Sequence, residues 1–372
     1  MPKKTLLYIN PGPTYWPRSL IYQEQFIELS KTFKGYIFTT SPRTETFPIG
    51  DFIYLSMKSR YSKVYRLKYF FFCVWKAIKI LTQKGKVDLV STYDPLITGL
   101  IGFVISRIHK SKFGVSVNGV YTSSAQWIDG PDGLEKRVKK FFYPVMMYFV
   151  LKHVDGIKLL FKNQIDCSKK MFKNKIIYVF PNFVQTYRFR NIREDKEILF
   201  SGFPFKLKGV DVLIEAFKKI SFKHPDWKLK ILGWYPNLEE LNNAIDGHLQ
   251  IYHHKAVPYE EMPEHIGTCG IFVLPSRSEA MGRVLVEAMA AGKPRIGSNV
   301  DGIPSVINDG VDGLLVEPRN INDLAEKLDL LMGNEELRRK LGKAGEIRAK
   351  KEFTKDVYFS NLTNFYNEVL EK

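Results

Sequence analysis

The chain has 372 residues and a mass of 43.1 kDa, and this length predicts two or three domains. Its hydrophobic content of 45% and charged content of 26% are ordinary for a globular protein, which excludes collagen-like repeats, wholesale disorder and a disulfide-built miniprotein. Residues 1–185 hold 29 basic and 11 acidic side chains, whereas residues 186–372 hold 27 and 28. This asymmetry predicts two modules, of which the first faces an anionic partner.

Short apolar runs alternate with longer helical patterns through the first half of the chain. Strands are predicted at residues 6–10, 35–39, 89–92, 114–117, 156–160 and 176–180. The longest helices are predicted at residues 20–31, 61–84 and 133–153. This alternation is typical of a doubly wound parallel sheet.

The second half repeats the pattern. Strands are predicted at residues 197–201, 227–232, 249–252, 270–274 and 313–316, and helices at 209–220, 239–244, 260–266, 284–291 and 321–332. The polar, basic stretch 182–196 has little periodicity, which predicts a boundary between a domain at 1–185 and a domain at 186–355. A lone helical pattern at 356–372 ends the chain.

The clearest chemical signal follows the strand at 270–274. Glu279 lies on the loop at the carboxyl end of that strand, where ligands bind in open α/β sheets. Gly282 allows close backbone approach, and Arg283 adds a cation to a helix N-terminus, which binds phosphate. Glu287 is one turn further along. Taken singly, Arg283 and Glu287 also suit a surface ion pair, and Glu279 suits a solvated loop.

A second basic loop follows the strand at 197–201. Gly202 ends the strand, and Lys206 and Lys208 precede the next helix. A lysine at this place can reach an anion bound at the sheet edge. A solvated basic loop fits the same residues equally well.

Together these residues match a known family. Glu279 and Glu287 are separated by seven residues, Lys208 is followed by Gly209, and related motifs occur at 231–233, 292–294, 301–304 and 309–314. Over most of residues 197–332 the chain resembles the retaining glycosyltransferases of family 4. The resemblance implies an α/β protein of the GT-B fold, with two doubly wound Rossmann-like domains that face a central cleft and a C-terminal helix, 356–372, that returns to the first domain.

The resemblance also implies a site for a nucleotide diphosphate-sugar donor in the second domain. Lys208 would contact the diphosphate, Glu287 the ribose and Glu279 the transferred sugar. The segment 254–257, which begins at His254, would pass near the base. The remaining donor contacts would be backbone amides, those of Met281, Gly282, Arg283 and Val284. In this family lysine, arginine and a helix N-terminus stabilise the leaving group, so we expect neither a metal nor another cofactor.

Several positions depart from the family pattern. Phe203 stands where an arginine is usual, so Lys206 or Arg283 would have to replace that charge. Asn118 stands where many members have a histidine beside the sugar. The glycine-rich N-terminal loop is reduced to Gly12 and its neighbours, and Gly12 would still bring the backbone near the phosphates of the donor. Asp94, at the end of the strand at 89–92, suits either an acceptor contact or a helix N-cap.

The excess positive charge gathers where aromatic residues are frequent. Residues 58–86 hold nine basic and no acidic side chains among seven aromatic ones, and 136–143 has the same character. This composition suits an anionic membrane surface, single-stranded nucleic acid, or solvated helices around a buried aromatic stripe. For a glycosyltransferase we favour the membrane, because acceptors are often lipid-linked.

We therefore expect a retaining, metal-independent glycosyltransferase that acts on a glycan or lipid-linked acceptor at the cytoplasmic face of a membrane. Three scattered cysteines, no bilayer-spanning run and no signal peptide favour the cytoplasm. A sugar-nucleotide epimerase or hydrolase of the same fold is the first alternative. A non-enzymatic nucleic-acid binder is the second, although it leaves Glu279 and Glu287 unexplained, and we expect no nucleic-acid partner.

Overall fold

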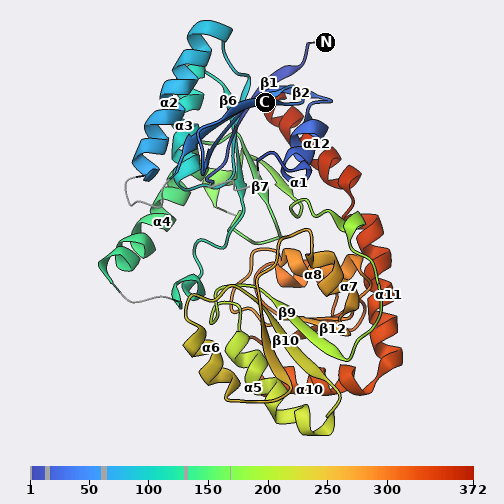
Figure 1. Ribbon diagram of the computed structural model, residues 1–372. Helices are drawn as coiled ribbons and strands as arrows, with labels where there is room; N and C mark the ends of the chain where they lie inside the picture. Colours follow the sequence, from blue (N-terminus) through green and yellow to red (C-terminus); the bar gives the residue numbers. More distant parts are fainter. Residues whose placement is uncertain (1, 13–16, 60–64, 130–132, 168) are drawn as a thin grey trace. The chain divides into compact units, whose positions relative to one another are not determined.

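The computed structural model describes residues 2–12, 17–59, 65–129, 133–167 and 169–372 (Figure 1). The described residues form two compact units. Unit 1 is drawn from Met1–Thr122, Gly133–Phe180 and Phe359–Lys372, and unit 2 from Ser123–Asp132 and Pro181–Tyr358. Unit 2 thus begins ahead of the predicted boundary at residue 185. It also takes in a segment that the sequence assigned to the first domain.

That segment joins unit 2 through hydrogen bonds that no local pattern reveals. The carboxylate of Asp129 accepts hydrogen bonds from the backbone amides of Lys206 and Leu207, at 2.9 and 2.7 Å. A side chain from the first half of the sequence therefore caps the loop that holds the predicted basic residues of the second half.

Unit 1 is built on one eight-stranded sheet. Its strands are β1 (Lys4–Ile9), β2 (Phe33–Ser41), β3 (Thr46–Ile49), β4 (Phe52–Lys58), β5 (Leu89–Thr92), β6 (Lys112–Val117), β7 (Gly156–Leu159) and β8 (Ile176–Val179). They lie in the order β3-β4-β2-β1-β5-β6-β7-β8, and all neighbours are parallel except β3 and β4. The hairpin β3–β4 was not predicted, because β3 is short and contains Pro48.

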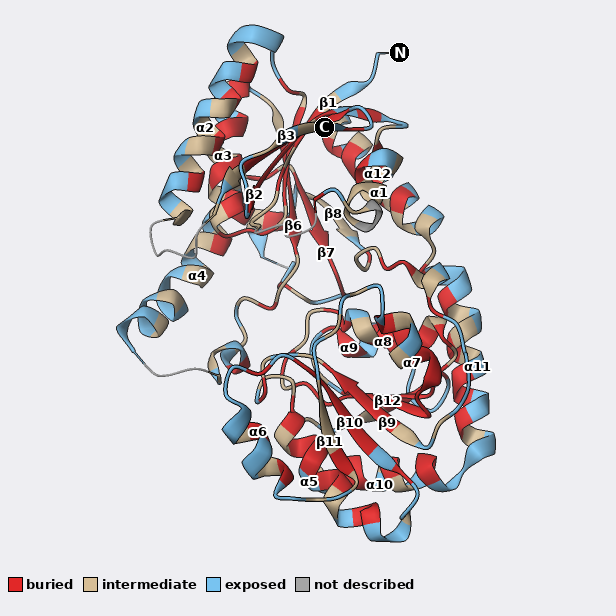
Figure 2. Ribbon diagram, in the orientation of Figure 1, coloured by how far each residue is buried: buried red, intermediate tan, exposed pale blue. Residues whose placement is uncertain are grey.

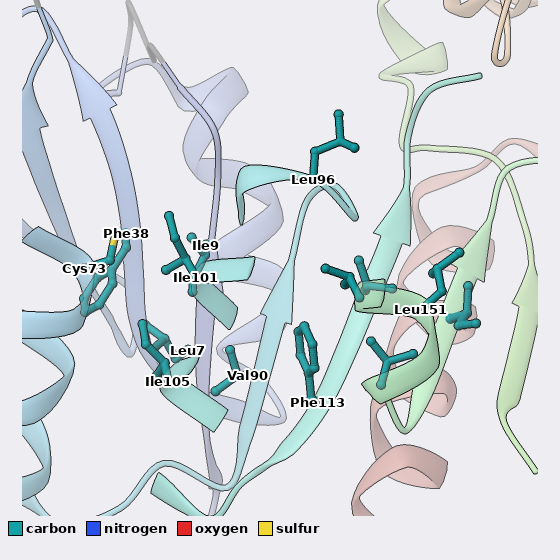
Figure 3. Packing of buried hydrophobic residues seen from close by; sticks show 14 of the residues in the cluster. Leu7, Ile9, Phe38, Cys73, Val90, Leu96, Ile101, Ile105, Phe113 and Leu151 are labelled. Atoms are coloured by element: carbon teal, nitrogen blue, oxygen red, sulfur yellow. The ribbon is translucent and has the colours of Figure 1, made fainter. Parts of the chain in front are cut away.

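The helices of unit 1 are α1 (Leu20–Leu29), α2 (Tyr65–Lys84), α3 (Ile97–His109), α4 (Leu134–His153) and the last helix, α12 (Lys355–Glu371). Helix α3 was not predicted from the sequence, because its many buried residues obscure the amphipathic pattern of a surface helix. Its Gly102 packs so closely that a Cβ atom would lie 2.4 Å from Thr92 and 2.7 Å from Phe113. Figure 3 shows the apolar core between α3 and the sheet.

The C-terminal helix packs on unit 1, as the fold expectation requires. Phe365 and Val369 of α12 lie against the sheet where β7 has Gly156, whose Cβ atom would meet Val369 at 2.3 Å. The hydroxyl groups of Tyr366 and Ser91 are 3.0 Å apart, which ties α12 to β5. Glycine at position 156 is thus what allows the helix to approach the strand.

Unit 2 contains a six-stranded parallel sheet. Its strands are β9 (Glu197–Ser201), β10 (Lys228–Gly233), β11 (Ile251–Lys255), β12 (Ile271–Leu274), β13 (Arg295–Ser298) and β14 (Leu314–Val316). They lie in the order β11-β10-β9-β12-β13-β14. In chain order this is 3-2-1-4-5-6, the Rossmann arrangement, and it confirms the predicted doubly wound fold.

Seven helices cover this sheet in the part of unit 2 that the structure describes. They are α5 (Val210–Ile220), α6 (Leu238–Ile245), α7 (Met262–Thr268), α8 (Arg283–Ala290), α9 (Ile303–Val306), α10 (Ile321–Gly333) and α11 (Glu335–Glu352). In Figure 2 the strands are largely buried and the outer faces of the helices are exposed. The sequence predicted neither β13 nor α11.

Strand β13 was missed because it begins with a buried cation. Arg295 is 0% exposed, and its guanidinium group lies 2.7 Å from the carboxylate of Asp312, which is itself 2% exposed. Arg348 of α11 binds the other carboxylate oxygen at 3.0 Å. An arginine ordinarily indicates an exposed position, and here the ion pairs together with hydrogen bonds to the carbonyl oxygens of Val306 and Asp312 make burial possible.

Candidate functional site

The predicted site residues of the second half meet at one place in unit 2. In a sheet of this order, successive strands are added toward one side from β9 to β11 and toward the other side from β12 to β14. The strand order therefore reverses between β9 and β12, the first and fourth strands. The loop after β9 carries Gly202 and Lys208, and the loop after β12 carries Glu279 and Gly282. Because β9 and β12 are paired neighbours, both loops lie at the same edge of the sheet, where open α/β sheets bind ligands.

Lys208 and Glu279 form an ion pair across these two loops. The ammonium group lies 2.6 Å from carboxylate oxygen Oε2, and the two side chains are 20% and 15% exposed. Gly209 makes the approach possible: its φ is 72°, and a Cβ atom would lie 2.0 Å from the carbonyl oxygen of Pro275. In the lysine-glycine motif, Lys208 therefore supplies the charge, and Gly209 is required because a side chain at that position would clash with the backbone of Pro275.

The loop that carries Glu279 is held by Asp301, which follows β13. One carboxylate oxygen of Asp301 accepts hydrogen bonds from the Ser278 hydroxyl at 2.5 Å and the Glu279 amide at 3.2 Å. The amide of Gly302 donates to the carbonyl oxygen of Glu279 at 3.0 Å. The motif at 301–304 has no evident role in the sequence, and in the structure it positions the loop of Glu279.

Helix α8 begins directly after this loop. Gly282 precedes it with a φ of 71°, a left-handed conformation that favours glycine. The first amides of a helix, here those of Arg283 and Val284, have no acceptor within the helix, and the helix dipole makes this end attractive to anions. Met281 is buried, so its side chain belongs to the packing of unit 2.

Arg283 and Glu287 form the ion pair that the simpler interpretation of the sequence allowed, but only Arg283 lies at the surface: its side chain is 49% exposed and that of Glu287 is 2% exposed. Glu287 is buried, and its Oε1 atom accepts from Arg283 Nε at 3.1 Å and from the Tyr259 hydroxyl at 2.9 Å. Arg283 also donates to the Tyr259 oxygen at 2.8 Å. Burial raises the pKa of Glu287, while the charges of Arg283 and Arg188 and the Tyr259 hydrogen bond oppose that rise.

Tyr259 and Arg188 are the site residues that sequence analysis missed. Tyr259 lies between β11 and α7, and the guanidinium groups of Arg283 and Arg188 lie over its ring at 4.8 and 5.3 Å. Arg188 belongs to a short 3-10 helix, Thr186–Arg188. No spacing in the sequence links these residues to Glu287, because three separate segments supply them.

Other predicted donor residues have different neighbours. The ammonium group of Lys206 lies 3.7 Å from Glu240 of α6, so its pairing differs from the predicted phosphate contact. Phe203 lies against Trp234, with ring centres 5.2 Å apart. His254 is on β11, and its ring lies 5.1 Å from that of His265 in α7.

The predicted residues of the first half lie within unit 1. Gly12 follows β1 and Asp94 follows β5. These two strands are paired neighbours, and the strand order of the sheet reverses between them. Asp94 is buried, which raises its pKa, and its carboxylate accepts from the Leu96 amide at 2.7 Å. This contact is a turn ahead of α3 and not its N-cap, because the N-cap residue is Leu96 and no side chain makes a cap hydrogen bond there. Asn118 donates to the carbonyl oxygen of Tyr93 at 2.6 Å.

Within the described ranges, no group of three or more histidine, cysteine, aspartate or glutamate side chains is arranged to hold a metal ion.

Comparison with known proteins bears on the same region. Residues 185–348 match the model of the family "Glycosyl transferases group 1". An uncharacterized glycosyltransferase of Methanocaldococcus jannaschii is 38% identical over 194 residues, which cover 51% of this chain and 52% of that protein. The chain spans about half or less of the length of the first curated relatives that it matches.

Two solved structures resemble the whole chain. Sucrose-phosphate synthase of Thermosynechococcus elongatus superimposes with a TM-score of 0.82 at 16% identity, covering 99% of this chain and 100% of that one. Anabaena HepE in complex with UDP gives 0.71 at 13% identity, covering 98% and 100%. These likenesses confirm the GT-B fold. The similarity to the glycosyl transferases group 1 covers residues 185–348, which lie in unit 2 and contain the candidate site.

Proposed function

We propose that the protein is a glycosyltransferase that takes its sugar from a nucleotide diphosphate-sugar. The observation that carries the proposal is the Lys208–Glu279 pair beside the start of α8, at the point of unit 2 where a Rossmann sheet binds its ligand. One cation, one carboxylate and a helix N-terminus at one sheet edge suit a diphosphate joined to a hydroxyl-rich sugar. UDP is bound to HepE, so it is the first nucleotide to test.

The charges divide into two tasks in this proposal. Breaking the bond between sugar and phosphate leaves negative charge on the diphosphate, so cations and amides fixed in advance lower the barrier. We assign that task to Lys208 and the first amides of α8. Arg283 is already bound to Glu287 and Tyr259, and its main task is to hold Glu287 toward the ribose.

We also propose that transfer retains the configuration of the sugar and needs no metal. Retention requires either a nucleophile or attack by the acceptor on the face that the diphosphate leaves. Metal independence is supported by the protein's own cations and amides at the proposed phosphate position, which would supply the neutralisation that a divalent ion supplies elsewhere.

The acceptor in this proposal is a glycan or a lipid-linked sugar at the cytoplasmic face of a membrane. The support is the charge of the first half of the chain, 29 basic against 11 acidic side chains. In the part of the chain that the structure describes, no helix is long and apolar enough to cross a bilayer.

Product analysis tests the proposed function. The purified full chain would be incubated with UDP-sugars, with and without a membrane extract as the source of acceptor, while UDP release and labelled glycan are measured. We expect acceptor-dependent UDP release that EDTA leaves unchanged. Release or interconversion of the sugar from donor alone would instead favour a hydrolase or an epimerase, and complete loss with EDTA would contradict metal independence.

The two glutamates are expected to differ in nucleotide binding. Glu287→Gln should weaken UDP binding by about 10–100-fold, since it removes a charged hydrogen-bond acceptor from the proposed ribose site. Glu279→Gln should keep UDP affinity, because it also frees Lys208 from its ion pair, and should lower turnover instead. Calorimetry with UDP measures the first effect and steady-state rates the second. The opposite division would contradict these assignments.

A further inference from the structure

Helix α2 exposes an apolar stripe on the side opposite the core. Tyr69, Cys73, Ala77 and Ile80 are buried. The exposed residues of the stripe are Leu67, Phe71, Trp75 and Ile78. Each precedes a buried residue by two positions and therefore lies about 200° around the helix from it. Phe71 is 61% exposed and Trp75 is 56% exposed. Aromatic side chains are normally buried, so an exposed row of this length indicates a surface that meets a partner.

Helix α4 exposes a second stripe with the same spacing. Its members are Leu134, Val138, Phe141, Val145 and Phe149, joined by Phe142. Phe141 is 67% exposed, and the buried residues of the helix begin only at Met147. The first half of α4 therefore contributes little to the core of unit 1, and core packing explains Tyr143 but not the exposed Phe141 and Phe142.

The two helices belong to the same face of unit 1. Helix α3 packs against both of them, and Arg66 of α2 donates to the hydroxyl of Tyr143 of α4 at 3.4 Å. Figure 2 shows exposed residues along both helices. Together they define what we call the α2–α4 face, made of the two apolar stripes and the basic residues beside them.

The charged side chains of these two helices are almost all basic. Helix α2 has five lysines and arginines and no acidic residue, and α4 has five and one, Glu135, which is paired with Lys139. The ammonium groups of Lys76 and Lys79 lie over the ring of Trp75 at 4.8 and 5.9 Å. Lysine stems can cover apolar surface while their charged ends reach outward, where they can meet anionic groups around an inserted ring.

We propose that the α2–α4 face docks the protein on a bilayer that contains anionic lipid. The apolar stripes suit insertion among acyl chains, and the flanking lysines suit the lipid phosphates. Single-stranded nucleic acid would use the charges and a few rings, but not the exposed leucine, valine and isoleucine side chains. Docking on an anionic bilayer accounts for both the apolar stripes and the basic residues of the α2–α4 face.

This inference rests on the proposed function in one respect, the acceptor. A cavity of about 110 Å³ is lined by Tyr65, Arg66 and Tyr69 of α2, Tyr143 of α4, and Asp94 after β5. Arg66 is adjacent in sequence to Leu67, the first residue of the α2 stripe. Because Arg66 and Tyr143 belong to the two helices of the docking face, this cavity is the part of unit 1 that we assign to the polar head of a lipid-linked acceptor.

Vesicle flotation with the full chain tests the proposal. We expect binding to phosphatidylcholine vesicles that contain phosphatidylglycerol, weaker binding to phosphatidylcholine alone, and release as salt rises. The triple change Phe71→Ser, Trp75→Ser and Phe141→Ser should weaken vesicle binding by about ten-fold or more, since these residues supply the apolar contacts. The matched control is Phe222→Ser in unit 2, which removes a ring that is 76% exposed and should leave binding unchanged.

Two outcomes would overturn the proposal. One is equal recovery of the native chain with both kinds of vesicle at low salt. The other is undiminished vesicle binding by the triple variant. Binding to a single-stranded oligonucleotide that survives the triple change, without vesicle binding, would favour nucleic acid instead. UDP affinity and donor turnover, measured on the same samples, keep the tests separate: failure of turnover with intact vesicle binding rejects the proposed function and not the docking face.

Discussion

Replacing Lys208 with alanine is expected to lower turnover by about 10²–10³-fold, the usual cost of losing one fixed group that stabilises transition-state charge. Lys208 is the cation that the structure holds at the carboxylate of Glu279, at the edge where β9 and β12 meet. Without it, the departing diphosphate would face that carboxylate unneutralised. Steady-state kcat and KM with a UDP-sugar measure the effect.

The ion pair also calls for a second variant, since alanine at 208 leaves Glu279 without its partner. The double change Lys208→Met with Glu279→Gln removes both charges, and turnover should stay low if the lysine acts on the diphosphate. Lys219→Ala is the matched control, because Lys219 is an exposed lysine of α5 that binds Asn322. Near-native turnover in a folded Lys208→Ala protein would refute the assignment.

Replacing Asp312 with alanine is expected to lower the free energy of unfolding by about 3–5 kcal/mol, because it leaves a buried guanidinium without its counter-charge. Burial already lowers the pKa of Arg295 to about 10, with the charge of Asp312 acting in the opposite direction. Asp312 also accepts from the Asn308 amide at 3.0 Å. The free energy of unfolding of a native protein is about 5–15 kcal/mol, so this loss is a large share of the total.

Urea unfolding of the full chain, followed by circular dichroism, measures this loss. Glu335→Ala is the control, since Glu335 and Arg339 form a surface pair whose side chains are mostly exposed, and such pairs contribute less than about 1 kcal/mol. Asp312→Asn, which keeps the shape and some hydrogen bonds, should fall between them. If Asp312→Ala cost no more than Glu335→Ala, the buried network would not hold β13 to α11.

The parts of the fold and of the candidate site that the sequence predicts are those marked by local sequence signals. The parallel α/β architecture follows from apolar runs alternating with helical periods, and Lys208-Gly209, Glu279 and Gly282 are recognisable because each stands next to a strand end or a helix start. Elements without such a signal were missed. Strand β13 begins with the buried Arg295, and β3 contains Pro48.

The composition of the α2–α4 face was visible in the sequence, but its geometry was not. Counting showed basic and aromatic residues together at 58–86, whereas the apolar stripe appears only when the buried residues of α2 are known. Arg66 looks like one more surface charge in the sequence. In the structure it lines a cavity with Tyr143 and Asp94.

By itself, the sequence determined the fold class, the strand ends at which the candidate donor site lies and the excess charge of the first half, because these depend on neighbouring residues. Only the tertiary structure decided which charges pair: Lys208 with Glu279, Arg283 and Tyr259 with Glu287, and Asp301 with the loop of Glu279. The physical reason is strand order. The sheet places β12 beside β9 although β10 and β11 lie between them in the chain, so the partners of a charge are set by topology and not by spacing.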